Sequence, residues 1–130
     1  MFPVLKKLHV HFDHILNAQK YKNLTGGKIV ISEDEKEFLS DGYFDMCEIF
    51  LRYGTLKNFK PDILVKDGDF LHFGDKKIEV LGTSGHTKGS VCYILEDNIF
   101  SGDTLFYNSF GATGFPIGDG EAIKKSLLIV

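Results

Sequence analysis

The sequence has no long apolar run, few cysteines and no excess of positive charge, and each absence excludes a class of protein. No stretch approaches the roughly 18 consecutive apolar residues of a transmembrane helix, and the N-terminus lacks a secretory leader pattern, so we expect a cytoplasmic protein without membrane contact. Cys47 and Cys92 lie far apart without a C-x-x-C spacing, which argues against a disulfide framework or a thiolate metal site. The net charge of -3 gives no broad attraction to nucleic acid.

The composition is that of one globular domain. A chain of 130 residues, 43% of them hydrophobic and 25% charged, is long enough to bury roughly two-thirds of the surface that its unfolded form exposes. Short apolar runs alternate with stretches of helical spacing. We therefore predict a single domain, 1–130, of the α/β (α+β) class. Helices are expected at 14–23, 33–39 and 121–128, and a short helix or a loosely structured cover at 46–53. Strands are expected at 4–8, 28–31, 63–65, 70–73, 78–81, 91–95 and 99–100.

Local signals mark the ends of two of these helices. Gly26-Gly27 is a stop signal for the first helix. Ser32 followed three residues later by Glu35 has the form of a capping box at the start of the second. His72, in the strand at 70–73, is expected to be a structural or surface residue.

Three histidines and an aspartate fall within the six residues His9-Val10-His11-Phe12-Asp13-His14. Side chains two apart in an extended segment share a face, so His9 and His11 can point at one metal ion. Asp13 and His14, where the chain turns into a helix, can then face a second. A lone histidine is more often an ordinary core or surface residue, and Asp13 alone would suit a helix N-cap. The density of donors favours metal binding.

Two later segments each place one donor after a strand. His86 lies among small residues in the turn-rich stretch 83–90, and Asp103 follows the strand at 99–100 across a glycine. A carboxylate has two oxygens and can bridge two cations. Taken singly, each segment is a weak signal, because turns often use such residues.

Together the His-x-His-x-Asp-His, Gly-His-Thr and Gly-Asp-Thr-Leu-Phe segments, in this order, resemble the metallo-β-lactamase superfamily and especially its small bacterial glyoxalase II-like (hydroxyacylglutathione hydrolase-like) branch. Similar stretches such as Gly89-Ser90-Val91 and 110–116 extend the resemblance over nearly the whole chain. The resemblance implies an αβ/βα sandwich, here expected to be partial.

The resemblance also implies the roles of the donors. His9, His11 and His86 would bind the first metal, Asp13 and His14 the second, and Asp103 would bridge them, with Asp13 as a candidate catalytic residue. Zinc is the metal expected first, with iron or manganese as alternatives. The family binds two ions per site, and we expect one or two in this chain. The implied activity is hydrolysis of a thioester or ester, such as S-(hydroxyacyl)glutathione, by a metal-bound hydroxide. No protein nucleophile is required.

The sequence departs from the family pattern at both ends. The histidine motif begins at residue 9, where family members have preceding strands, and the chain reaches Val130 before a further Gly-His segment that completes the second metal site in the family. Leu8 stands where the family commonly has threonine. These departures predict uncovered strand edges, and therefore a homodimer or larger assembly, a partner chain, or a poorly stable fragment.

Two other functions remain open from the sequence. In the first, the chain would be a catalytically impaired remnant that binds one metal at His9, His11 and His86. In the second, it would act like the mononuclear iron persulfide dioxygenases, which resemble the same branch. A nucleic-acid-processing or lactam-hydrolysing activity is less favoured, because the chain is acidic and its flanking residues resemble the glyoxalase branch.

Overall fold

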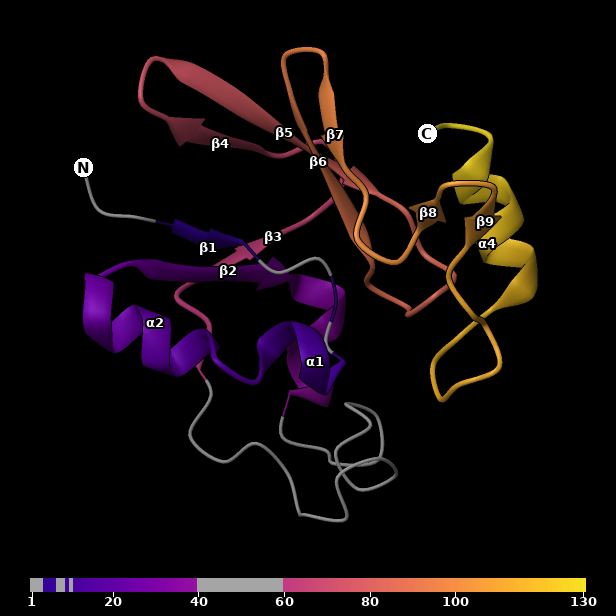
Figure 1. Cartoon of the computed structure of the whole chain (residues 1–130), viewed down its shortest axis with the longest axis horizontal. Helices are drawn as coiled ribbons and strands as arrows, with labels where there is room; N and C mark the ends of the chain where they lie inside the picture. Colours follow the sequence, from indigo (N-terminus) through magenta and orange to yellow (C-terminus); the bar gives the residue numbers. More distant parts are fainter. Residues whose placement is uncertain (1–3, 7–8, 10, 40–59) are drawn as a thin grey trace.

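The strands form two main sheets that pack against each other, with helices on the outer side of the first (Figure 1). The computed structural model describes residues 4–6, 9, 11–39 and 60–130. Helices and strands are mixed, and the sheets are parallel in the first half and antiparallel in the second. The predicted α/β (α+β) class is confirmed.

The first sheet is parallel, with the order β1 (Val4–Lys6), β2 (Lys28–Ser32) and β3 (Ile63–Val65). The central strand β2 is buried on both faces after Lys28, which suits its run of β-branched residues. Ile29 and Ile31 face the helices, and Val30 faces the second sheet. The alternation along β2 therefore joins the two halves of the core.

The helix predicted at 14–23 is two helices, α1 (Phe12–Ile15) and α2 (Ala18–Thr25). The break lets Ile15 and Ala18, three residues apart, both reach the core behind β2. The predicted stop is confirmed, because Gly26 has a φ of 67° and donates its N–H to the carbonyl of Lys22. Asp13 lies inside α1 and is not an N-cap, since His11 occupies that position.

The segment that follows β2 is a 3-10 helix, η1 (Glu33–Phe38), instead of an ordinary helix to residue 39. Ser32 is its N-cap, and the Ser32 hydroxyl accepts the Asp34 N–H at 3.3 Å. The Glu35 carboxyl, expected to complete a capping box, bonds instead to a distant loop: its Oε1 accepts the N–H of Gly89. The helix predicted at 46–53, and Cys47 with it, lie outside the described residues.

The second sheet is antiparallel, with the order β4-β5-β6-β7, and the predicted strands are confirmed to within two residues at each end. A two-stranded hairpin and the last helix follow it, the helix starting one residue earlier than predicted. The elements are β4 (Phe70–Phe73), β5 (Lys76–Gly82), β6 (Val91–Leu95), β7 (Asn98–Phe100), β8 (Leu105–Phe106), β9 (Ser109–Phe110) and α4 (Gly120–Leu127).

The two sheets meet in a core built from alternate residues of both. Val30 and Val65 of the first sheet pack in one cluster with Val80, Val91 and Tyr93 of the second. A second cluster lies between β2 and the helices and includes Leu39, just beyond η1. Cys92 is a buried free thiol, as predicted from its spacing.

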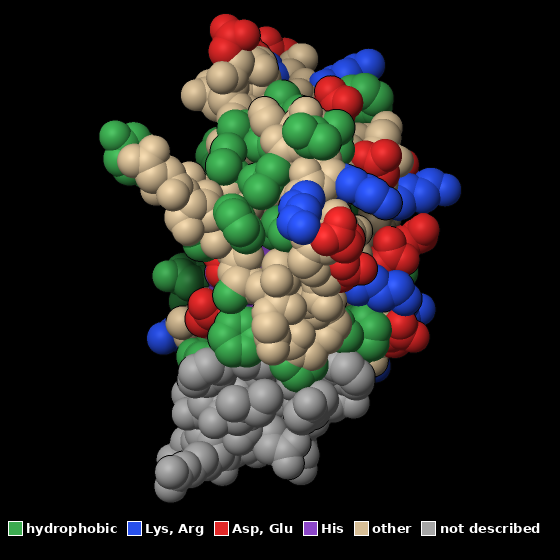
Figure 2. Space-filling model, turned by 90° about the vertical axis from the view of Figure 1, so that its right-hand side faces the viewer, with side chains coloured by type: hydrophobic (Ala, Val, Ile, Leu, Met, Phe, Trp, Pro, Cys, Tyr) green, Lys and Arg blue, Asp and Glu red, His purple; other side chains and the backbone are tan. Residues whose placement is uncertain are grey.

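Among the described residues, most of the exposed large hydrophobic side chains lie in the second half. Figure 2 looks onto the side that carries α4 and the β8–β9 hairpin, where hydrophobic side chains are spread over the surface. His72 is also exposed, on β4, as a surface residue. Every helix among the described residues is too short or too polar to traverse a bilayer. Exposed apolar residues of the second half include Phe70, Phe73, Ile99, Phe100, Leu105, Phe106, Tyr107 and Phe110.

Candidate metal centre

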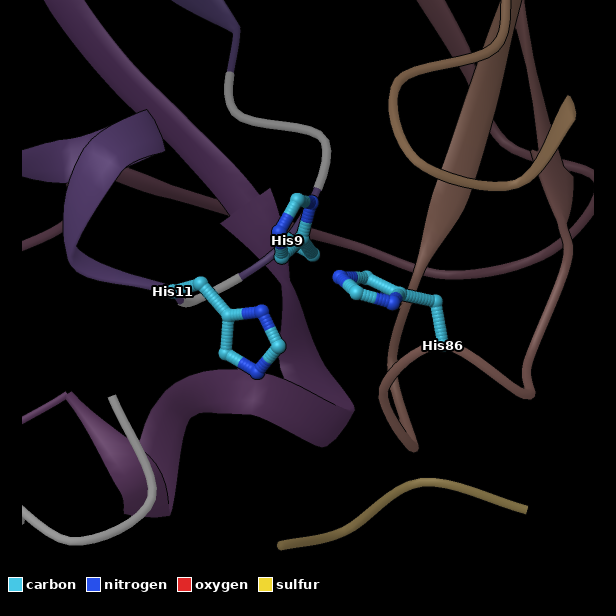
Figure 3. A group of neighbouring side chains, drawn as sticks. All are labelled: His9, His11 and His86. Carbon is cyan, nitrogen blue, oxygen red and sulfur yellow. The ribbon is translucent and has the colours of Figure 1, made fainter. Parts of the chain in front are cut away.

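Two chain segments bring three histidines together. His9 follows β1, His11 is the extended residue that begins α1, and His86 lies in the loop between β5 and β6. Their rings point toward one another (Figure 3), and each pair of ring centroids is 4.7–4.8 Å apart. The donor atoms of all three lie within 4.8 Å of one another. Residues far apart in sequence therefore form one compact donor group.

These three histidines are buried, and one nitrogen of each ring has no hydrogen-bond partner within the described part of the chain. The atoms concerned are the Nε2 of His9, of His11 and of His86. A buried polar atom left without a partner costs about 1–3 kcal/mol. One ring nitrogen from each histidine, all within 4.8 Å of one another, fits a divalent cation, because imidazole nitrogen is a preferred ligand of zinc and iron.

Burial also keeps the histidines in the form that binds metal. Burial lowers the pKa of His9 well below its ordinary range, and the neighbouring His14, His11 and His86 lower it further. Burial, assisted by His86, lowers the pKa of His11 to about 4. Both rings are therefore neutral at neutral pH, and a neutral imidazole has a lone pair to donate.

A backbone carbonyl fixes the tautomer of His86. Its Nδ1 lies 2.6 Å from the carbonyl oxygen of Ala112. A carbonyl can only accept, so Nδ1 carries the proton and Nε2 keeps its lone pair facing the other two histidines. Such outer partners of ligand histidines orient the ring and raise its basicity.

A second donor group adjoins the first and shares His9 with it. It consists of His9, His14 and Asp103. Asp103 lies centrally, with one carboxylate oxygen 3.4 Å from His14 Nε2 and the other 3.4 Å from His86 Nε2. Asp13 belongs to neither group within the described residues, although its Oδ2 is 3.7 Å from His14 Nε2 and its side chain is largely exposed. The structure thus brings together five of the six predicted ligands and leaves Asp13 at the rim.

Close packing around two glycines sets the position of His86 and Asp103. A Cβ on Gly85, whose φ is 142°, would lie 2.3 Å from the backbone nitrogen of Ile123 in α4. A Cβ on Gly111 would lie 1.8 Å from the carbonyl oxygen of Asp103 and 3.0 Å from Cγ of His86. Only glycine permits either approach.

Hydroxyl groups tie the same loops together from behind. Thr83 and Thr104 are fully buried, and their hydroxyls are 3.0 Å apart. Thr83 precedes the His86 loop and Thr104 follows Asp103, so this bond joins the bases of the two segments. Sequence reasoning did not identify these residues, nor Gly111, Ala112 and Glu35, as part of the site. Thr83 and Thr104 border or belong to the Gly-His-Thr and Gly-Asp-Thr-Leu-Phe segments, Gly111 and Ala112 fall in the stretch 110–116, and Glu35 carried only the capping-box signal.

Comparison with known families and proteins gives concordant matches. The family model described as "Metallo-beta-lactamase superfamily" matches residues 9–128 of this chain. The hydroxyacylglutathione hydrolase GloC of Haemophilus influenzae is 31% identical over 129 positions, covering 95% of this chain and 59% of that protein. The hydroxyacylglutathione hydrolase of Francisella tularensis subsp. novicida is 39% identical over 122 positions, covering 92% of this chain and 40% of that protein. The chain spans about 40–60% of the length of such relatives.

Solved structures share the fold over nearly the whole chain. The BLEG-1 B3 metallo-beta-lactamase superposes with a TM-score of 0.89 at 26% identity, covering 98% of this chain and 63% of that one. TTHA1623, solved in a di-iron-bound form, gives a TM-score of 0.81 at 23% identity, covering 97% and 62%. At 23% identity, the similarity to TTHA1623 shows a shared fold alone. The predicted partial metallo-β-lactamase-type sandwich is therefore confirmed.

Proposed function

The chain belongs to the metallo-beta-lactamase superfamily, and on this premise we propose that it binds metal at the histidine cluster and hydrolyses a thioester or ester, with S-(hydroxyacyl)glutathione as the first substrate to test. One observation carries the proposal: three buried histidines each offer a ring nitrogen, these nitrogens lie within 4.8 Å of one another, and the Nε2 atom of each ring has no hydrogen-bond partner in the described structure. The relatives named hydroxyacylglutathione hydrolases support the substrate class.

The three buried histidines would hold the first ion, and His14 with Asp103 would hold a second. When bound, the metal supplies Lewis-acid chemistry: it lowers the pKa of a water molecule and polarises the carbonyl under attack. The Ala112 carbonyl keeps His86 in the required tautomer. The surrounding protein excludes water from the three rings, which are almost fully buried.

The carboxylates provide the polar rim of the site. Asp103 is partly exposed and lies within 3.9 Å of His9, His14 and His86, so it can accept a hydrogen bond from a water molecule and orient it. Asp13 is more exposed and adjoins His14, which suits a group that exchanges a proton with solvent. We therefore keep Asp13 as the candidate catalytic residue and as a weaker candidate for ligation.

Zinc is the first metal to test. Neutral imidazole and carboxylate donors suit zinc, but the same set accepts iron or manganese, so that availability contributes to the choice. TTHA1623 in its di-iron-bound form is a structural neighbour with the same fold. Both metals belong in the loading experiment.

A second candidate function has its own supporting observation. The group His9, His11 and His86 is wholly buried, whereas the second group includes the partly exposed His14 and Asp103 and reuses His9. A site that holds one ion is thus better formed than a site for two. One iron per chain would favour a persulfide dioxygenase-like protein, and one metal without turnover would favour a binding remnant.

The test combines metal analysis with turnover. Metal-free protein is loaded with Zn²⁺ or Fe²⁺, its metal content is measured, and hydrolysis of S-lactoylglutathione, a simple ester and a β-lactam is followed. We expect metal-dependent hydrolysis of the thioester above that of the other substrates. His72→Ala is the matched control, because His72 is an exposed histidine outside the site.

The outcomes separate the candidates. His11→Ala should abolish turnover, and His72→Ala should leave it unchanged. Hydrolysis that persists in His11→Ala, or a loaded wild-type protein that hydrolyses nothing in the panel, contradicts the proposed activity. Faster hydrolysis of the β-lactam than of the thioester would indicate that the substrate is a lactam instead of a thioester.

A further inference from the structure

Glu35 is a buried carboxyl group that joins two parts of the chain 54 residues apart. It lies in η1, is only 1% exposed, and its Oε1 accepts the N–H of Gly89 at 2.8 Å. Gly89 is three residues beyond His86 in the same loop. A buried hydrogen bond to a carboxyl group is strong and directional, so it can fix where a loop sits.

The loop backbone rests directly on the Glu35 side chain. A Cβ added to Gly89 would lie 2.5 Å from Cγ of Glu35 and 3.0 Å from its backbone nitrogen. The loop therefore has no room to move toward η1, and the hydrogen bond opposes movement away from it. Thr87 and Ser90 complete a tight turn between these points, with their hydroxyl oxygens 2.7 Å apart.

The other end of this connection belongs to the half of the protein that supplies His9 and His11. Leu39, which directly follows η1, shares a core cluster with Ile15 at the end of α1. His11 is the N-cap residue of that helix. Glu35 thus ties the His86 loop to the same packed frame that holds His11.

We propose that Glu35 is a positioning residue of the metal centre, which holds the loop at 83–90 so that His86 meets the ion bound by His9 and His11. The inference rests on the proposed metal binding. Groups that hydrogen-bond directly to a metal-ligating side chain typically contribute about 10–100-fold in metal affinity. Glu35 bonds to the loop backbone instead, so we expect a loss at the lower end of that range, about 10-fold, when the carboxyl group is removed.

The same 3-10 helix offers a matched control. Glu37 also contacts the His86 loop, through Lys88 at 3.5 Å, but both side chains of this ion pair are exposed. Exposed pairs contribute little. Glu37→Ala therefore removes the same type of side chain, from the same helix, toward the same loop, without touching the buried bond.

The experiment compares wild type with Glu35→Ala, Glu35→Gln, Glu37→Ala and Val65→Ala. Val65→Ala truncates the buried core at β3 and reports what general destabilisation does. Three quantities are measured: Zn²⁺ affinity by competition with a chromophoric chelator, the ligand-field spectrum of the Co²⁺-substituted protein, and hydrogen exchange of the Gly89 amide in the metal-free protein.

We expect Glu35→Ala to weaken Zn²⁺ binding about 10-fold, to change the Co²⁺ spectrum and to speed exchange at Gly89. Glu35→Gln retains an acceptor oxygen and should restore most of all three. Glu37→Ala and Val65→Ala should keep the wild-type spectrum. Wild-type affinity and spectrum in Glu35→Ala, or the same spectral change in Val65→Ala, would overturn the positioning role alone. A wild-type chain that binds no metal would overturn the proposed function together with it.

Discussion

The two halves of the molecule supply the candidate site in opposite ways. The first half, a parallel sheet with its helices, provides His9, His11 and His14 from one short run of sequence. The second half, an antiparallel sheet with the β8–β9 hairpin, provides His86 and Asp103 from two separate loops.

The difference shows how the two halves reach the same precision. The first half needs only local geometry, since a bend at His11 between β1 and α1 places its histidines together. The second half needs long-range contacts, namely the Thr83–Thr104 bond, the close approach at Gly111 and the bond from Glu35 to Gly89. We expect the loss of a ligand to weaken metal binding equally in both halves. Mutations of supporting residues, including Glu35, should mainly displace the donors of the second half.

The largest expected effect is the loss of one ligand from either half. His11→Ala and His86→Ala should each lower Zn²⁺ affinity by more than the roughly 10–100-fold expected for an outer partner. Isothermal titration of the metal-free protein gives the affinity. Nearly full binding in one variant and none in the other would show that only one half holds the ion.

Next in size is the effect of filling the space at Gly111. Gly111→Ala places a methyl group against Asp103 and His86, and overpacking of this kind costs about 1–3 kcal/mol. Denaturant unfolding should show this loss, together with weaker Zn²⁺ binding. Gly114→Ala is the control, because a Cβ there meets nothing within 4 Å. Equal losses in the two variants would contradict the special role of the approach at Gly111.

The dependence of stability on pH belongs to the first half. The folded state lowers the pKa of His11 from 6.5 to about 4, mainly by burial, and lowers that of His9 as well. Between these values the unfolded chain binds more protons than the folded one, so the free energy of unfolding falls as pH falls, by about 1.4 kcal/mol per pH unit for each such proton.

Urea unfolding of the metal-free protein between pH 7 and pH 4 measures this slope. His11→Ala should reduce it by the contribution of one proton. A stability that stays flat over this range would mean that the two rings are accessible to protonation in the folded state.

The smallest expected effect concerns self-association through the second half. Ile99 and Phe100 are exposed on the edge strand β7, and an uncovered apolar edge favours pairing with another chain. We expect a homodimer by size-exclusion with light scattering at low micromolar concentration. Phe100→Lys should shift it toward monomer, and Leu24→Lys, at an exposed apolar position of the first half, should not. A wild-type monomer contradicts this prediction.

Most of the fold was predictable because it depends on local patterns. The β-branched run of β2, the apolar pairs of β5 and β6 and the glycine at 26 each fix an element within a residue or two. The break between α1 and α2 and the 3-10 form of η1 were not predicted, because packing against β2 and the contact with Gly89 decide them. The roles of Asp13 and the other ligands remain predictions.

The sequence by itself determined which side chains can bind metal, since their spacing and chemical type are local properties of the chain. Only the tertiary structure decided that Asp103 lies between His14 and His86 while Asp13 stays at the rim. It also turned Glu35 from a candidate cap into a contact with a loop 54 residues away. The physical reason is that burial and hydrogen bonding between distant segments depend on how the two sheets pack, which no short window of sequence contains.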